Sequence, residues 1–336
     1  MACIFCHKSP PEISYSKEHI FPDALGGSLI IKDSVCKNCN DKLGHSVDNL
    51  LTNSFLIQMV RMGLGISNRD GVIPTPLTNG EVVGHQGRKG AYKVNHDGQN
   101  EIRVFPLIKE SNVPNTNETL KTILANPDEI EDVKNKIFER AKAVSDKPTI
   151  IARFRTVIKR PTIQKNAEMN VDALFRPILK IAYELGVYWL GNQYAKHING
   201  IPIAAAVMGK SISNIEAQIT FFPPSSSFEK YNIPSTHHLA MLRKENNQAW
   251  LKLRIFNLIE ANILLAEVSD DFPNFTPRWL VINPLDSTLN EGAEENFPTA
   301  WVKPNGEIKW GKKEKNNYLV ETYINEKRTG NTLVSL

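Results

Sequence analysis

The chain has 336 residues, of which 41% are hydrophobic and 23% are charged. This usage is ordinary for globular proteins, so it excludes wholesale disorder, a collagen-like chain and a coiled coil, and the length predicts two domains or one with a small appendage. The net charge of +4 is too small to establish a nucleic-acid partner and is compatible with one if the basic residues cluster.

Neither a membrane span nor a secretory signal is visible in the sequence. No uninterrupted apolar run of about 18 residues occurs, and the first residues, MACIFCHKSP, lack a basic flank followed by an apolar core. We therefore expect a cytoplasmic protein.

All four cysteines lie within the first 39 residues, as the pairs Cys3–Cys6 and Cys36–Cys39. Each CxxC pair can present two thiolates to one tetrahedral zinc ion, at Zn–S distances of about 2.3 Å. The spacing therefore predicts a structural Zn²⁺ site with four cysteine ligands. The 29 residues between the pairs exceed a minimal zinc ribbon, so we expect a folded element between them.

Apolar residues recur at helical spacing after Asn40, which predicts a helix that ends at Gly63 or Gly65. Glycine and short alternating stretches over 66–108 predict small antiparallel strands, and 109–147 contains a charged helix. These two stretches form a β-rich segment with a helical connector.

All five tryptophans lie in the second half of the chain, which predicts a second hydrophobic core there. The patterns in this half predict a strand over 148–159, a long buried helix over 171–195 with Pro177 in its first turns, strands over 236–268 that turn at Asn246–Asn247, and a hairpin at Asn305–Gly306. We divide the chain into segments 1–62, 63–147 and 148–336.

Three motifs inside the cysteine-rich segment occur in a characteristic order. The run EHIFP at 18–22 precedes Gly26-Gly27, and the second CxxC pair leads directly into Asn40. Over about residues 3–50 the chain resembles the HNH endonucleases, the ββα-metal nucleases of the His-Me finger superfamily, in their zinc-knuckle form. The resemblance implies an α+β protein in which a small zinc-bound ββα nuclease module precedes a larger mixed α+β domain with an antiparallel sheet.

The resemblance also implies roles for three residues. Glu18 matches the acidic ligand of a catalytic divalent cation, Asn40 matches the ligand on the helix, and His19 matches the general base. Mg²⁺ or Mn²⁺ suits these oxygen ligands and leaves positions open for a phosphate oxygen and the leaving 3′ oxygen. A neutral imidazole can deprotonate water at physiological pH.

One position departs from the family pattern. Many members carry an Asn before the second knuckle that orients the histidine, whereas residues 28–35 contain none. Asp33 or a backbone carbonyl is the substitute that we consider. On the following helix, we expect His45 to be structural and Asp48 to brace the fold or to support the ligands.

The nuclease segment through residue 60 has five Lys, no Arg and six acidic residues. Electrostatic contacts with DNA phosphates must therefore come from other parts of the chain. We expect phosphate contacts from two basic clusters outside this segment. They comprise Arg88 and Lys89 in a glycine-flanked loop, and Arg153, Arg155, Lys159 and Arg160.

The sequence therefore favours a metal-dependent HNH endonuclease that hydrolyses phosphodiester bonds in double-stranded DNA. The resemblance implies a role in restriction or antiphage defence. Two alternatives stay open: a zinc-ribbon DNA-binding regulator without catalysis, and a nuclease gated by a signal ligand or partner protein bound to residues 148–336. A single site cuts one strand per engagement, so double-strand cleavage calls for a homodimer or two events.

Overall fold

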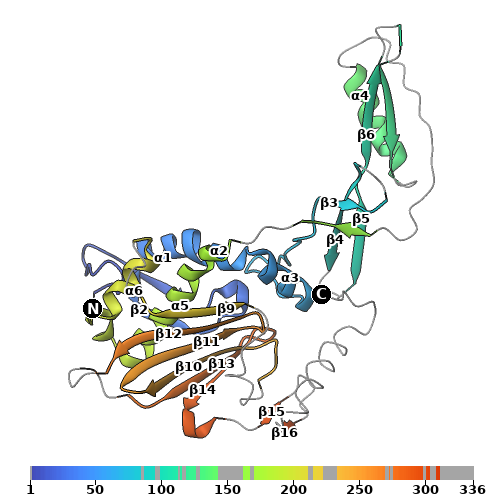
Figure 1. The fold of residues 1–336 in the computed structure, drawn as a ribbon. Coiled ribbons are helices and arrows are strands. Elements are labelled where there is room, and N and C mark those ends of the chain that lie inside the picture. The colour runs from blue at the N-terminus through green and yellow to red at the C-terminus, as the bar shows by residue number, and fades with distance from the viewer. Residues whose placement is uncertain are drawn as a thin grey trace. The chain divides into compact units, whose positions relative to one another are not determined.

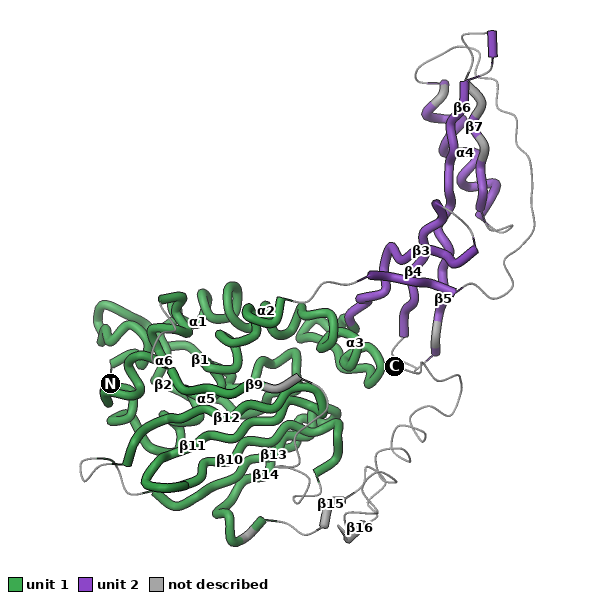
Figure 2. Tube along the Cα trace, viewed as in Figure 1, with its two compact units in different colours: residues 1–73, 169–336 green, residues 74–168 purple. Residues whose placement is uncertain are grey.

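The computed structural model describes residues 2–84, 87–94, 99–112, 114–115, 119–125, 129–142, 162–166, 170–210, 215–221, 233–268, 272, 275–297, 300–302 and 308–310. The chain forms two compact units (Figure 2). The first combines residues 1–73 with 169–336, and the second consists of residues 74–168. The boundaries of these units differ from those of the three segments inferred from the sequence. The roles assigned to those segments stay predictions.

The first unit begins with a hairpin and a helix (Figure 1). Strand β1 (Tyr15–His19) pairs antiparallel with β2 (Ile30–Cys36), and the short turn η1 (Asp23–Leu25) lies in their connection. Helix α1 (Lys37–Leu43) follows at once, because the Cys36 sulfur accepts a hydrogen bond from the Cys39 N–H and so caps the helix. The predicted ββα module with a larger α+β region after it is confirmed.

The predicted helix after Asn40 is present as several segments rather than one. A π-helical turn, η2 (Gly44–Asp48), joins α1 to α2 (Asn49–Thr52), and α3 (Phe55–Leu64) follows. Gly65 ends α3 in the left-handed conformation, with φ of 69°. Gly63 lies within α3 and does not end it.

The rest of the first unit is an antiparallel sheet with helices packed on it. Helix α5 (Phe175–Leu190), entered through η3 (Asp172–Leu174), packs on β11 and β12, and α6 (Gly200–Val207), after η4 (Tyr194–Lys196), packs on α5. In spatial order the strands are β14 (Thr288–Ala293), β13 (Arg278–Asn283), β10 (His238–Glu245), β11 (Gln248–Ile255), β12 (Ile259–Glu267) and β9 (Ala217–Phe221).

Several predicted elements of this half are confirmed. Asn246 and Asn247 both have positive φ between β10 and β11, as a tight hairpin turn requires. Pro177 lies in the first turn of α5. After η6 (Glu294–Asn296), β15 (Ala300–Val302) pairs with β16 (Ile308–Trp310), whereas the predicted Asn305–Gly306 turn lies outside the described residues.

The predicted second core is present as a small cluster of Ile233, Leu239, Met241, Trp279 and Val281, but the main core is not confined to either half of the chain. One continuous hydrophobic cluster contains Leu25 and Val35 of the hairpin connection and β2, Ile181 of α5 and Leu253 of the sheet. The reason is that α5 is buried on all sides: 12 of its 16 residues are buried, so one side packs on the sheet and another on the amino-terminal segment. The cysteine-rich segment and the carboxy-terminal half therefore share one core.

The second unit contains the predicted small strands and charged helix. A four-stranded sheet has the order β5 (Asn100–Val104), β4 (Lys89–Val94), β3 (Gly80–Val82) and β8 (Ile163–Gln164). Strands β6 (Leu107–Asn112) and β7 (Thr119–Leu124) form a hairpin, and α4 spans Ile130–Lys142. The strand predicted over 148–159 lies outside the described residues. Within the described parts of both units, no helix is long and apolar enough to cross a membrane.

Candidate active site

Four cysteines from two separate stretches converge beside the hairpin. The sulfur atoms of Cys3, Cys6, Cys36 and Cys39 all lie within 4.8 Å of one another, and those of Cys6 and Cys36 are 3.8 Å apart. Two sulfur ligands on one tetrahedral zinc ion are separated by about 3.8 Å. All four cysteines are free thiols, so the cluster has the donor set and the size of a structural zinc site.

The connection between β1 and β2 requires both of its glycines. Gly26 has φ of +74°, and a Cβ there would lie 2.4 Å from the Pro284 Cα; a Cβ on Gly27 would lie 1.9 Å from the Phe21 carbonyl oxygen. Next to them, the Leu25 carbonyl oxygen accepts a hydrogen bond of 2.9 Å from the His238 Nε2. The Gly-Gly pair thus lets the loop after His19 lie directly against the carboxy-terminal half.

A bulge in β2 alters the pairing opposite Glu18. Ser16 pairs with Val35 and Glu18 with Ile31, so three residues of β2 oppose one of β1, and Asp33 in this bulge has a positive φ of 53°. Asp33 is exposed and lies opposite Lys17 rather than His19. The bulge therefore places Asp33 away from the pairing partner of His19, which is Ile30.

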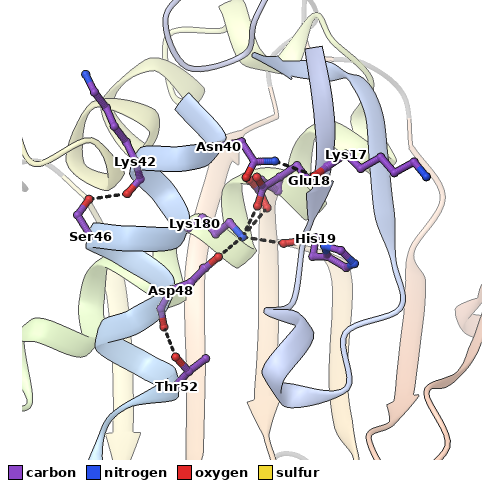
Figure 3. A network of polar contacts seen from close by, with 10 residues as sticks. Lys17, Glu18, His19, Asn40, Lys42, Ser46, Asp48, Thr52 and Lys180 are labelled. Atoms are coloured by element: carbon purple, nitrogen blue, oxygen red, sulfur yellow. Dashed lines mark hydrogen bonds and ion pairs between the residues drawn. The ribbon is translucent and has the colours of Figure 1, made fainter. Parts of the chain in front are cut away.

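Glu18 is buried, with 3% of its side chain exposed, and its partner comes from the other half of the first unit. Glu18 Oε1 lies 2.6 Å from Lys180 Nζ of helix α5, and the same ammonium donates a 2.7 Å hydrogen bond to the His19 carbonyl oxygen. Figure 3 shows this ammonium between β1 and the helix that carries Asp48. Lys180 is fully buried.

Two more carboxylates surround Lys180. Asp48 Oδ2 lies 3.2 Å and Glu184 Oε2 3.5 Å from Lys180 Nζ. Among the described residues, Asp48 Oδ1 and Glu184 Oε1 are buried without a hydrogen-bond partner. Three carboxylates therefore face one ammonium in a region that excludes water, and the cluster has more acceptor oxygens than this one cation satisfies.

Burial raises the pKa of Glu18, Asp48 and Glu184 above their ordinary values, and the Lys180 ammonium opposes that rise. For Lys180, burial acts to lower the pKa, but the carboxylates, Glu184 foremost, raise it above its usual value. Lys180 is therefore charged, and it is the counter-ion that offsets the burial of Glu18.

His19 ends β1 with 21% of its side chain exposed. Its Nε2 lies 3.9 Å from the Asp23 Oδ1, and the other Asp23 oxygen lies 3.5 Å from the Nε of the exposed Arg69. Burial lowers the pKa of His19, and Asp23 opposes that effect. The imidazole is therefore neutral at pH 7 and reaches solvent, as a general base must.

Asn40 on α1 lies beside the same strand. Its Nδ2 donates a 2.7 Å hydrogen bond to the Lys17 carbonyl oxygen, one residue before Glu18 (Figure 3). The amide oxygen of Asn40 is the atom left for a ligand. Since Lys180 binds one Glu18 oxygen, the remaining Glu18 oxygen and the Asn40 amide oxygen are hard donors on adjacent elements, which fits Mg²⁺ or Mn²⁺.

Sequence reasoning missed Lys180, Glu184, Asp23 and Arg69. A signal for the first two exists: between Ile178 and Leu190 they are the only charged residues, and they are four positions apart in an otherwise apolar helix. Buried charges at that spacing indicate a paired internal network. The partner Glu18, 162 positions earlier, is not visible in this pattern.

Two of the predicted DNA-contact residues, Arg88 and Lys89, belong to the second unit. Arg88 is buried, with 8% exposed, and Lys89 begins β4, where its ammonium lies 2.8 Å from Glu81. The expected glycine-flanked loop is short at these residues, since Arg88 directly precedes β4 and Lys89 is its first residue. A phosphate contact from either residue stays a prediction. Arg153, Arg155, Lys159 and Arg160 lie outside the described residues.

Comparison with protein families matches residues 3–56 to a family model described as HNH endonuclease. The comparison with curated proteins and the comparison with solved structures gave no match. The matched range contains all four cysteines, Glu18, His19, Asn40 and Asp48, and it ends before α5 begins. Residues 3–56 of this chain are an HNH endonuclease domain with a four-cysteine cluster.

Proposed function

We propose that this protein is a metal-dependent endonuclease that hydrolyses DNA phosphodiester bonds, with His19 as the general base. The observation that carries the proposal is the placement of a partly exposed, neutral imidazole next in sequence to a buried carboxylate, on the hairpin of an HNH endonuclease domain. A ribbon used only for binding has no need of a carboxylate held by a buried ammonium beside a histidine.

Glu18 and Asn40 would hold the divalent cation, which when bound stabilises negative charge on the phosphate and on the leaving oxygen. The Asp23 carboxylate faces the His19 Nε2 at 3.9 Å. This placement favours the tautomer with its proton on Nε2, so Nδ1 is the atom that accepts a proton from the attacking water. Asp23 thus takes the orienting role that we assigned to Asp33 or to a backbone carbonyl.

Arg69 is linked to this histidine through Asp23, and 74% of its side chain is exposed. A guanidinium in that position can make bidentate hydrogen bonds to a substrate phosphate while it stays close to the Asp23 carboxylate. We assign Arg69 a phosphate contact close to the scissile bond. The basic run Arg153, Arg155, Lys159 and Arg160 stays a prediction for contacts farther along the DNA.

Double-stranded DNA as the substrate, a homodimer for double-strand cleavage, a regulatory partner and a role in restriction or antiphage defence all stay predictions. The shared core of the first unit bears on gating by the carboxy-terminal half. Because α5 packs on both the sheet and the nuclease segment, release of the nuclease from that half would require unpacking the core. We therefore favour a permanently assembled enzyme over one freed by a signal.

The test is a plasmid-nicking assay on the zinc-loaded protein with Mg²⁺ or Mn²⁺ and with a matched RNA. We expect conversion of supercoiled to open-circular DNA, and a loss of at least about 100-fold in rate for His19→Ala. His45→Ala is the matched control, because His45 is an exposed helix histidine of the same domain. Near wild-type nicking by His19→Ala would contradict the assignment of the base, and binding without cleavage by the wild type would favour a DNA-binding regulator.

A further inference from the structure

One ammonium contacts two successive residues of β1, the predicted metal ligand and the predicted base. Lys180 Nζ lies 2.6 Å from the Glu18 carboxylate and donates to the His19 main-chain carbonyl at 2.7 Å. Lys180 belongs to α5, outside the 3–56 range of the family match. We propose that Lys180 is a positioning residue of the nuclease site, so that a helix of the carboxy-terminal half completes the catalytic centre; this inference rests on the proposed function.

The two contacts of Lys180 fix different parts of the site. The ion pair with Glu18 restrains that carboxylate through its Oε1 atom. The bond to the His19 carbonyl fixes the peptide group at the end of β1, from which the imidazole projects. Partners that orient a metal ligand change metal affinity or activity by about 10- to 100-fold when they are removed.

A competing interpretation is that Lys180 occupies the place of the cation and leaves when the enzyme is activated. The packing of α5 argues against it. Tyr183, on the next turn of the helix, donates a 2.7 Å hydrogen bond to the Ile4 carbonyl oxygen, and its ring lies 5.2 Å from that of Phe5. Lys180 itself is fully buried, so the ammonium cannot withdraw without unpacking the helix from the zinc-site segment.

The second contact also distinguishes the two interpretations. A lysine that only mimicked a cation would need carboxylates and nothing more, whereas Lys180 also binds a main-chain carbonyl that belongs to the fold of the hairpin. Asp48, at 3.2 Å on the π-helical turn, ties the same ammonium to the helix that follows Asn40. One side chain thus links the strand with Glu18 and the helical segment with Asn40, the two elements that would hold the cation.

The experiment measures Mn²⁺ binding by electron paramagnetic resonance on the full-length zinc-loaded protein, with nicking rates alongside. Lys180→Met alone would leave two buried carboxylates and the partly buried Asp48 without a counter-ion. The substitution is therefore made in a Glu184→Gln background and compared with Glu184→Gln itself. Lys180→Gln in the same background is the second variant, since it keeps a hydrogen-bond donor if the Met form does not fold. Arg176→Met is the matched control, because Arg176 lies one turn earlier on α5 and donates to the Val207 carbonyl oxygen rather than to β1.

We expect Lys180→Met in this background to weaken Mn²⁺ binding at least about tenfold at unchanged zinc content, whereas Arg176→Met binds Mn²⁺ as the wild type does. Equal Mn²⁺ affinity with and without Lys180 would overturn the inference, and tighter binding without it would show an inhibitory lysine and overturn it as well. The proposed function fails separately: a wild type that binds Mn²⁺ through Glu18 and loses affinity without Lys180, but cuts no nucleic acid, refutes nuclease activity and leaves the positioning role standing.

Discussion

The four-cysteine cluster and the Lys180 cluster (Glu18, Asp48, Lys180 and Glu184) both involve the amino-terminal segment, but they are built in opposite ways. Each half of the cysteine cluster is a local CxxC pair, and all four ligands lie within residues 3–39. The Lys180 cluster joins Glu18 and Asp48 to Lys180 and Glu184, which are more than a hundred residues away. The cysteine cluster holds the hairpin together locally, whereas the Lys180 cluster makes the site depend on a distant helix.

The two clusters therefore contribute differently to the stability of the fold and to the geometry of the active site. A metal site contributes folding free energy directly, since its ligands are not preorganised in the unfolded chain. A buried ion cluster contributes little net stability, but removing one partner leaves the others uncompensated. Loss of the zinc site should therefore abolish folding of the segment. Loss of Lys180 should change both the geometry of the site and the stability of the fold, and a second substitution that neutralises a carboxylate should restore only the stability.

The largest effect is expected from Cys36→Ser. This change removes one zinc ligand and the sulfur that caps α1, and because the segment shares its core with the sheet, we expect the whole first unit to lose its cooperative unfolding transition. Zinc content by atomic absorption and thermal unfolding by circular dichroism are the measurements. A folded Cys36→Ser protein with one bound zinc would contradict the structural role that we assign to the cysteine cluster.

Lys180→Met should destabilise the fold by about 3–5 kcal/mol, because the buried Glu18 and Glu184 and the partly buried Asp48 lose their counter-ion. Adding Glu184→Gln should recover part of this loss, since it removes one of the uncompensated charges. Urea unfolding of the single and double variants measures the loss of unfolding free energy and the part of it that Glu184→Gln recovers. If the double variant is no more stable than Lys180→Met alone, the cluster is not coupled as the distances imply.

His238 provides a pH test of the contact between the hairpin connection and the sheet. It is fully buried, accepts a hydrogen bond from the Phe256 N–H on Nδ1 and donates to Leu25 from Nε2. Burial lowers its pKa to about 4, below the unfolded value of about 6.5. Protonation therefore favours the unfolded state, and this stability is present above about pH 6.5 and lost as the pH falls toward 4.

Relative to His238→Gln, the wild type should lose about 2 kcal/mol of unfolding free energy between pH 7.5 and pH 5. The comparison with the variant is needed because the raised pKa values of the buried carboxylates act in the opposite direction over part of this range. Urea unfolding at the two pH values supplies the measurement. Parallel pH dependence in both proteins would mean that His238 is accessible to protons in the folded state.

The smallest effect is expected from Arg69→Ala. Loss of one exposed phosphate contact should raise KM a few-fold with little change in kcat, and should reduce the slope of log K against log salt by about 0.9 for duplex DNA. Lys8→Ala is a suitable control, since Lys8 is an exposed cation of the same unit paired with Glu12. An unchanged salt slope for Arg69→Ala would place the scissile phosphate away from Asp23.

The two clusters also differ in how much of each could be predicted from the sequence. Paired CxxC spacing predicts the zinc site, because it is local and has a coordination requirement. The EHIFP run and the Gly-Gly pair carry the family resemblance that implies the ββα module. The hairpin turn at Asn246–Asn247 is also predicted from a local pattern. Lys180 is not, because no periodicity links a charged residue in an apolar helix to a strand 160 positions earlier.

The main core shared by the two halves could not be predicted, for a related reason. Tryptophan distribution reports which segments are apolar, but not which segments pack together, and α5 contributes to both sides of one core. Arg88 shows a similar limit, since a glycine-flanked basic pair is compatible with either a phosphate-binding loop or the start of a strand. Long-range packing decides both cases.

The most direct test of the account is a crystal structure of the zinc-loaded protein soaked with Mn²⁺, with anomalous scattering used to locate the ion. The account predicts a manganese peak bound by the free oxygen of Glu18 and the amide oxygen of Asn40, while Lys180 Nζ stays on the other Glu18 oxygen and on the His19 carbonyl. A manganese peak that displaces Lys180 from Glu18, or one that lies away from both ligands, would contradict it.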